Sequence, residues 1–217
     1  MSQPWLGLAK QPPGFGVLLP IVSAAPALLI TAAIVGDTFY GSSWLGADPI
    51  KEGEHLLGEW TLRALFGTLL ITPLRYHSGW NWLAKHRRTL GLFAFAYVVL
   101  HFLTWLLLDA QVWVSEYVGW ADVWKDITKR PYITVGFLAM LLMVPLALTS
   151  TKKAIARMGK RWRPLHRLIY PISLLGVLHY ILSVKKDLTE PLLYLGVLSA
   201  LLLWRVWDAR RRADARV

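Results

Sequence analysis

Three histidines are the side chains of this chain best suited to chemistry. His101, His166 and His179 lie inside or at the edge of strongly apolar stretches, and an ionisable side chain inside a bilayer usually has a function. Neutral imidazole is a common ligand of iron. The chain has no cysteine, which excludes iron–sulfur clusters and disulfides held by thiolates. These residue types predict haem iron held by histidine within a bundle of membrane helices.

His101 and His179 are predicted to lie at the same depth. His101 follows Arg88 by about 20 Å of helix, and His179 follows Pro164 by about 22 Å, if each of these residues marks the inner edge of its span. Both spans are expected to run from the inner to the outer side, so the two rings could hold one haem iron from opposite faces. A hydrogen bond to a neighbouring helix is the alternative for either histidine alone, whereas their matched depth favours haem.

His166 is expected to belong to a different site. On an ideal helix its ring points about 220° away from that of His179, although a kink at Pro171 would alter that phase. Arg87, by contrast, precedes His101 by nearly whole turns and lies about 40° from the same face. These residues predict an inner cofactor held by His166, with Arg87 or Arg88 near its acidic groups, and a histidine facing lipid headgroups is the equal alternative. The other histidines are expected to be solvated at the interfaces: His55, His77 and His86.

Six apolar stretches must position these side chains. The composition is 55% hydrophobic with a mean hydropathy of +0.43, and a bilayer span needs about 20 mostly apolar residues. Such stretches cover residues 17–36, 56–74, 89–108, 132–150, 164–183 and 191–207. The prediction is an all-α integral membrane bundle of six transmembrane helices. It forms one domain over residues 17–207, between an N-terminal segment (1–16) and a basic tail (208–217).

The distribution of charge predicts the orientation of the bundle. Basic residues gather in connections 75–88 and 152–163 and in the tail, whereas connections 37–54, 109–130 and 185–190 carry most of the acidic residues. By the positive-inside rule the basic side and both termini are cytoplasmic, and the expected location is the bacterial inner membrane. No soluble domain is left to use the net charge of +11 for nucleic acid, so the basic tail is expected to meet anionic lipid.

Two local patterns add to this arrangement. Glu59 and Arg63 are four residues apart, which places them on one helix face as a possible ion pair. Four aromatic residues of connection 109–130 recur at helical spacing and predict a helix on the membrane surface, facing lipid or a partner protein. They are Trp113, Tyr117, Trp120 and Trp124.

An ordered series of short motifs runs along most of the chain from residue 45 to residue 207. The motifs are GADP (46–49), LITPLR (70–75), RRTLGL (87–92), LH (100–101), RPY (130–132), LTST (148–151), LHRLIY (165–170) and HY (179–180). Together they resemble the MsrQ (YedZ) family, the haem-binding membrane subunits of periplasmic methionine sulfoxide reductase systems. That family is part of the ferric-reductase-like transmembrane superfamily.

The resemblance implies b-type haem, one or two copies, and FMN. Electrons are expected to come from the quinone pool or a cytosolic flavin reductase. They would pass to a periplasmic molybdopterin subunit, MsrP-like, that reduces methionine sulfoxide in oxidised proteins. The ligand histidines of the family map onto His101, His166 and His179. Arg87 stands where the wider superfamily would have a further inner histidine, which leaves room for flavin or a differently ligated haem.

The sequence thus predicts an electron-transfer subunit and not a complete enzyme. Electrons would enter at the basic face, near Arg87, Arg88 and His166, and leave through a haem at His101 and His179. One rival is a stand-alone transmembrane ferric or quinone reductase. The second is a non-redox transporter or scaffold, for which the sequence offers no broken-helix pair or inverted repeat.

Overall fold

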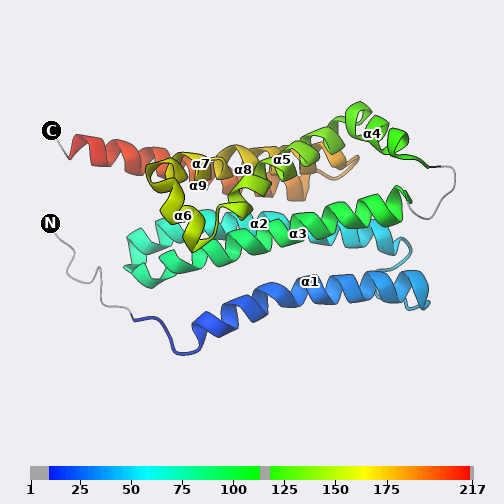
Figure 1. The fold of residues 1–217 in the computed structure, drawn as a ribbon, viewed down its shortest axis with the longest axis horizontal. Coiled ribbons are helices and arrows are strands. Elements are labelled where there is room, and N and C mark those ends of the chain that lie inside the picture. Colours follow the sequence, from blue (N-terminus) through cyan, green and yellow to red (C-terminus); the bar gives the residue numbers. More distant parts are fainter. Residues whose placement is uncertain (1–9, 113–117, 216–217) are drawn as a thin grey trace.

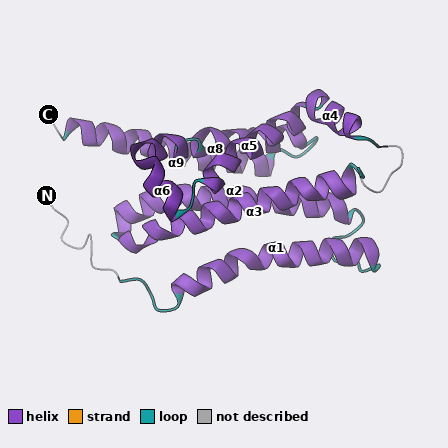
Figure 2. Ribbon diagram, in the orientation of Figure 1, coloured by secondary structure: helices purple, strands orange, loops and turns teal. Residues whose placement is uncertain are grey.

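The fold is a bundle of long helices that lie side by side (Figure 1). The computed structural model describes residues 10–112 and 118–215, and in those ranges every regular element is a helix (Figure 2). This confirms the all-α fold class. The helices are α1 (Phe15–Phe39), α2 (Pro49–Ser78), α3 (Arg87–Thr104), α4 (Trp120–Lys129), α5 (Pro131–Leu148), α6 (Lys152–Met158), α7 (Trp162–His166), α8 (Ile169–Ser183) and α9 (Thr189–Asp214).

Four helical segments are long and apolar enough to cross a membrane. They are α1, the segment Asn81–Asp109 that contains α3, α5 and α9. The pair Lys152–His166 and Ile169–Ser183, bent by 43°, makes a fifth if it counts as one span. The span predicted over 164–183 is therefore interrupted between α7 and α8. The span predicted over 56–74 lies within the single helix α2, which is not in this set and carries Glu59 and Arg63.

The helix ends follow ordinary capping rules. Asp48 caps α2 by accepting a hydrogen bond from the Lys51 amide (3.2 Å), and Pro49 takes the first helical position, where no amide hydrogen is needed. The side-chain contact with Lys51 lowers the pKa of Asp48 below its usual value. Residues 152–163, expected as a loop, are instead helical: Thr151 caps α6 by accepting a hydrogen bond from the Ala154 amide (3.1 Å), and α7 begins at Trp162.

Tyr97, a buried residue of α3, forms hydrogen bonds with the backbone of α1 next to Pro26. Pro26 has no amide hydrogen, and a proline inside a helix disturbs the backbone ladder. Tyr97, 1% exposed, inserts its hydroxyl there: it donates to the Ser23 carbonyl (2.8 Å) and accepts from the Ala27 amide (3.1 Å). Ser23 and Ala27 are four residues apart, so the hydroxyl bridges the acceptor and the donor of the helical turn next to Pro26.

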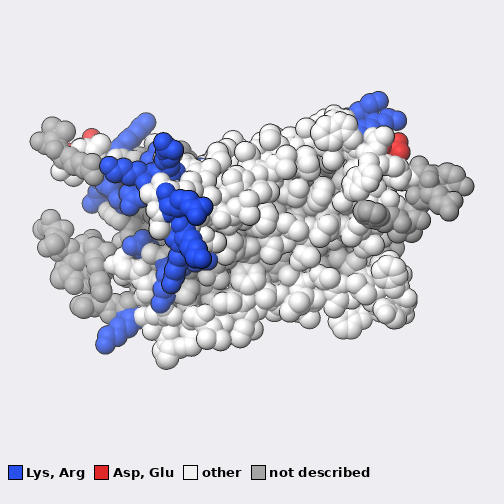
Figure 3. Space-filling model, viewed as in Figure 1, with Lys and Arg blue, Asp and Glu red and all other residues white. Residues whose placement is uncertain are grey.

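The surface of the bundle is apolar around its middle and charged at its ends. On the face drawn in Figure 3, Lys and Arg gather at the end where α1 begins and α9 ends. Large apolar side chains point outward along the helices, among them Leu28, Leu29, Leu193 and Leu203. Such a continuous exposed apolar surface is expected of helices that face lipid.

Only part of the predicted surface helix can be compared with the structure. α4 spans Trp120–Lys129 and exposes Trp120 and Trp124, as the spacing predicts. Trp113 and Tyr117 lie outside the described residues. The inner face of α4 packs through Val123 and Ile127 against the end of the α3 segment and the start of α5.

Candidate functional site

His101 on α3 and His179 on α8 meet across one cavity. Their ring centroids are 5.9 Å apart, the ring planes are inclined at 81°, and both rings line a cavity of about 370 Å³. The rest of the lining is mainly apolar. The two histidines that the sequence pairs by depth are therefore neighbours in space.

The backbone fixes the tautomer of both rings. His101 Nδ1 lies 2.8 Å from the Glu54 carbonyl oxygen on α2, and His179 Nδ1 lies 2.7 Å from the Tyr132 carbonyl oxygen on α5. A carbonyl can only accept, so each Nδ1 carries the proton and donates it. Each Nε2 is then left with a free lone pair. A hydrogen bond from Nδ1 to a carbonyl is the usual support of a metal-binding histidine, since it orients the ring and raises its basicity.

Two glycines make room for these rings. A Cβ on Gly136 of α5 would lie 2.7 Å from His179 Nδ1, a distance that real side chains do not show. A Cβ on Gly58 of α2 would lie 3.5 Å from His101 Nδ1, which is an ordinary contact. His179 therefore depends on the missing side chain at Gly136, whereas His101 does not depend on Gly58.

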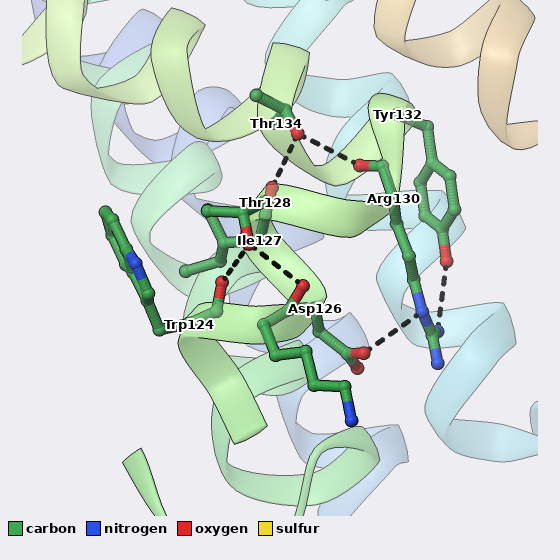
Figure 4. A network of polar contacts seen from close by, with 8 residues as sticks. Trp124, Asp126, Ile127, Thr128, Arg130, Tyr132 and Thr134 are labelled. Carbon is green, nitrogen blue, oxygen red and sulfur yellow. Dashed lines mark hydrogen bonds and ion pairs between the residues drawn. The ribbon is translucent and has the colours of Figure 1, made fainter. Parts of the chain in front are cut away.

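A network of polar contacts lies at the corner between α4 and α5, close in the chain to the Tyr132 carbonyl that orients His179 (Figure 4). The Thr134 hydroxyl contacts the carbonyl oxygens of Ile127 (2.5 Å) and Arg130 (3.2 Å). Arg130 in turn pairs with Asp126 (3.3 Å) and donates to the Tyr132 hydroxyl (3.4 Å). The network fixes the first turn of α5, where Tyr132 lies.

His166, Arg87 and Arg88 line a second cavity of about 420 Å³ toward the basic end of the bundle. The structure thus brings together the three residues predicted for an inner site. The ring of His166 stacks on Trp162 with centroids 3.9 Å apart, and its Nε2 lies 3.0 Å from the Thr149 hydroxyl. That hydroxyl donates to the Pro145 carbonyl (2.6 Å). It therefore accepts from Nε2, which leaves Nδ1 as the free nitrogen of neutral His166.

The histidine sets fit a porphyrin-held iron better than a metal held by side chains alone. No group of three or more His, Asp or Glu side chains suited to a metal ion occurs within the described ranges. A side-chain zinc site needs three or four such ligands. Haem iron needs only one or two axial ligands from the protein, because the porphyrin supplies the others. Two oriented imidazoles in an apolar cavity satisfy that requirement.

The two cavities are separated by a thin layer of side chains. Leu65, Met143 and Ile172 line both, and all three are buried in the main hydrophobic core. A cofactor in one cavity would therefore lie next to a cofactor in the other, with an apolar partition that excludes water between them.

Sequence reasoning missed several residues of both cavities. Arg205 of α9 lines the cavity of His166 (the inner cavity), and Glu54 and Gly136 line the cavity of His101 and His179 (the outer cavity). Arg205 carried a usable signal, since an arginine between apolar residues of a span is unusual. A carbonyl partner or a close glycine approach has no such signal.

The other histidines have different surroundings. His86 is buried (6% exposed) between Phe15 and Trp82, so the expectation of a solvated ring is wrong for it. His77 accepts a hydrogen bond from Trp204 Nε1 (3.1 Å). His55 lines the outer cavity.

The predicted pair of Glu59 and Arg63 is present at 2.5 Å. The Tyr180 hydroxyl donates to a Glu190 carboxylate oxygen (2.8 Å) and also lies 3.3 Å from a Glu59 carboxylate oxygen. The residue next to His179 is thus tied to two carboxyl groups.

Comparison with known proteins shows which class of membrane protein this helical bundle with facing histidines belongs to. Residues 57–177 match the family described as "Ferric reductase like transmembrane component". That stretch contains the helices that carry His101 and His166 and most of α8. No solved structure matches the chain.

The curated relatives narrow the class. The chain is 48% identical over 197 residues to the protein-methionine-sulfoxide reductase heme-binding subunit MsrQ of Xanthomonas campestris pv. campestris (strain 8004), covering 88% of each. It is 48% identical over 192 residues to the MsrQ of Rhodospirillum rubrum, covering 88% of this chain and 89% of the relative. The chain belongs to the MsrQ family.

Proposed function

We propose that this protein is a membrane electron-transfer subunit that uses b-type haem to supply a periplasmic methionine sulfoxide reductase. The observation that carries the proposal is the pair His101 and His179 in one apolar cavity, each with Nδ1 held by a backbone carbonyl. When bound there, haem would supply a one-electron iron couple. The chain supplies two oriented Nε2 lone pairs, a low dielectric and exclusion of water.

The inner cavity is proposed as the point of electron entry. His166 offers one ring nitrogen, and Arg87 and Arg88 offer positive charge for the acidic groups of a second haem or of FMN. The donor would be the quinone pool or a cytosolic flavin reductase, because the basic end of the bundle is the end proposed to face the cytoplasm. The shared layer of Leu65, Met143 and Ile172 supports transfer between the two cavities.

The proposed orientation has six spans in the bacterial inner membrane, with α2 and the bent pair α7–α8 each counted as one. Both termini, including the segments 1–16 and 208–217, would be cytoplasmic. The gathering of Lys and Arg at the end where α1 begins and α9 ends supports this orientation. The outer cavity would then open toward a periplasmic MsrP-like molybdopterin subunit.

The test is a cofactor count and an electron-transfer assay on purified protein. A pyridine-haemochrome measurement and a flavin count should give at least one haem per chain. Reduced protein should be reoxidised by methionine sulfoxide only when an MsrP-like subunit is added. Purified protein without a Soret band, after expression with ample haem, would refute the proposal in favour of a non-redox scaffold or transporter.

A stand-alone ferric or quinone reductase would have the same haem spectrum. It differs in reactivity, since it would reduce ferric chelates or quinone at rates that an added MsrP-like subunit does not change. Rapid reoxidation by ferric chelate, with none through the sulfoxide-reducing subunit, would therefore replace the proposed function with this one.

A further inference from the structure

The inner cavity concentrates positive charge without a balancing acid. Five arginines line it, and no aspartate or glutamate is among its lining residues in the described part of the chain. They are Arg87, Arg88, Arg163, Arg167 and Arg205. Arg88, Arg163 and Arg167 are exposed, whereas Arg87 and Arg205 are half-buried, so a counter-charge would stabilise these two most. The charge of this cavity therefore suits an anionic ligand.

Two of these arginines converge on one neutral acceptor. Arg205 Nη2 donates to the Thr72 hydroxyl (3.2 Å) and to the Leu69 carbonyl (2.7 Å), and Arg87 Nη2 also donates to Thr72. The Nε atoms of both arginines are buried and have no hydrogen-bond partner. A guanidinium is a planar donor suited to the two oxygens of a carboxylate or phosphate. Both side chains thus keep unused donors at the point where an acceptor is needed.

The backbone and an aromatic ring hold Arg205 in place before any ligand binds. Its guanidinium carbon lies 5.3 Å from the ring centroid of Tyr170, which itself lines the cavity. The bond to the Leu69 carbonyl anchors the same group to α2. Because cation–π contact and hydrogen bond fix its orientation, little conformational entropy would be lost on binding an anion.

We propose that Arg205, together with Arg87, binds the anionic group of the cofactor that occupies the inner cavity. This rests on the proposed function, which places a cofactor there, and adds the residue that anchors it. The group is a carboxylate or a phosphate, and its two possible sources are a propionate of a second haem and the phosphate of FMN. In either case the positive charge of Arg205 also favours the reduced cofactor.

The test compares Arg205→Gln with Arg210→Gln in the full-length purified protein. Arg210 is exposed on the same helix and does not line the cavity, so its replacement removes the same charge without touching the site. For each variant, haem and flavin per chain, redox titration curves and the affinities for FMN and riboflavin would be measured. The low-spin signal of the outer haem serves as the folding control.

The quantity that changes in Arg205→Gln depends on whether the anion is a haem propionate or the phosphate of FMN. A propionate predicts that Arg205→Gln lowers the midpoint potential or the content of the inner haem and leaves the outer haem unchanged. A phosphate predicts that FMN affinity falls about tenfold or more while riboflavin affinity stays the same. Arg205→Lys keeps the charge but not the planar fork, so it should recover only part of either effect.

Different results would overturn the role of Arg205 and the proposed function. Unchanged inner potential, cofactor content and FMN preference in Arg205→Gln would overturn the role of Arg205. A wild-type protein with one outer haem and no other cofactor would overturn it too, and would leave the outer electron-transfer site intact. A wild-type protein without haem would overturn the proposed function itself.

Discussion

Gly136→Ala is expected to loosen haem binding although it adds a single methyl group. The new Cβ would lie 2.7 Å from His179 Nδ1 and 2.9 Å from its Cε1, whereas ordinary contact begins near 3.4 Å. The ring must therefore move away from α5 by about 0.7 Å. Its hydrogen-bond acceptor, the Tyr132 carbonyl, is also on α5. The movement stretches a bond of 2.7 Å beyond the useful range of about 3.2 Å.

The size of the expected loss in haem affinity follows from the loss of the hydrogen bond between His179 and the Tyr132 carbonyl. A buried donor left without its acceptor costs about 1–3 kcal/mol, and disturbing the partner of a ligating histidine lowers metal affinity about 10–100-fold. We expect a loss of haem affinity in that range. The helix itself should not be weakened, because alanine is favoured over glycine inside a helix by about 0.5–1 kcal/mol.

Haem titration of apoprotein and the reduced-minus-oxidised spectrum of purified protein measure this effect. Gly58→Ala is the matched control, since its Cβ would make an ordinary 3.5 Å contact with His101 and should leave affinity nearly unchanged. Wild-type affinity in Gly136→Ala would refute the reasoning. An equal loss in both variants would also refute it, because only the Cβ at Gly136 lies too close to its histidine (2.7 Å, against 3.5 Å at Gly58).

Three further tests, with five substitutions in all, address other parts of the structure. His101→Ala and His179→Ala should each remove most of the reducible low-spin haem signal, whereas His166→Ala should leave a substantial part of it. A full low-spin spectrum in His101→Ala would contradict the pairing of His101 with His179. Tyr97→Phe removes the two hydrogen bonds between the Tyr97 hydroxyl and the α1 backbone and should lower the free energy of unfolding in detergent by about 1–3 kcal/mol; an unchanged value contradicts the bridging role. Because the folded-state pKa of Asp48 lies below its unfolded value, its stabilisation is present at neutral pH and is lost as pH falls through the folded-state value. Asp48→Ala should therefore lower the melting temperature at pH 7, with a smaller difference in acid, and a pH-independent difference would count against this.

The outer site was largely predictable because its chemistry is carried by residue type and helix length. An imidazole deep in an apolar stretch is unusual, and a rise of 1.5 Å per residue is enough to match His101 with His179. The carbonyl partners were not predictable. They depend on α2 and α5 packing beside α3 and α8, and a backbone oxygen has no residue type to mark it.

The inner site was predictable only in part. Arg87, Arg88 and His166 were expected near one another, but Arg205 comes from α9, and nothing in the sequence fixes which face of that helix turns toward α2. The break between His166 and Ile169 was also missed. The polar residues His166 and Arg167 lie at the break, and Pro171 a few residues later only allows a kink, so the sequence does not place the turn of 43°.

Axial ligation of the outer haem is the most direct test of the central claim that His101 and His179 hold one iron between them. Near-infrared magnetic circular dichroism of the oxidised, purified protein distinguishes bis-imidazole iron from other ligand pairs. The account predicts a bis-imidazole band that is lost in both His101→Ala and His179→Ala and kept in His166→Ala. A band from another ligand pair, or one that survives removal of either outer histidine, would contradict it.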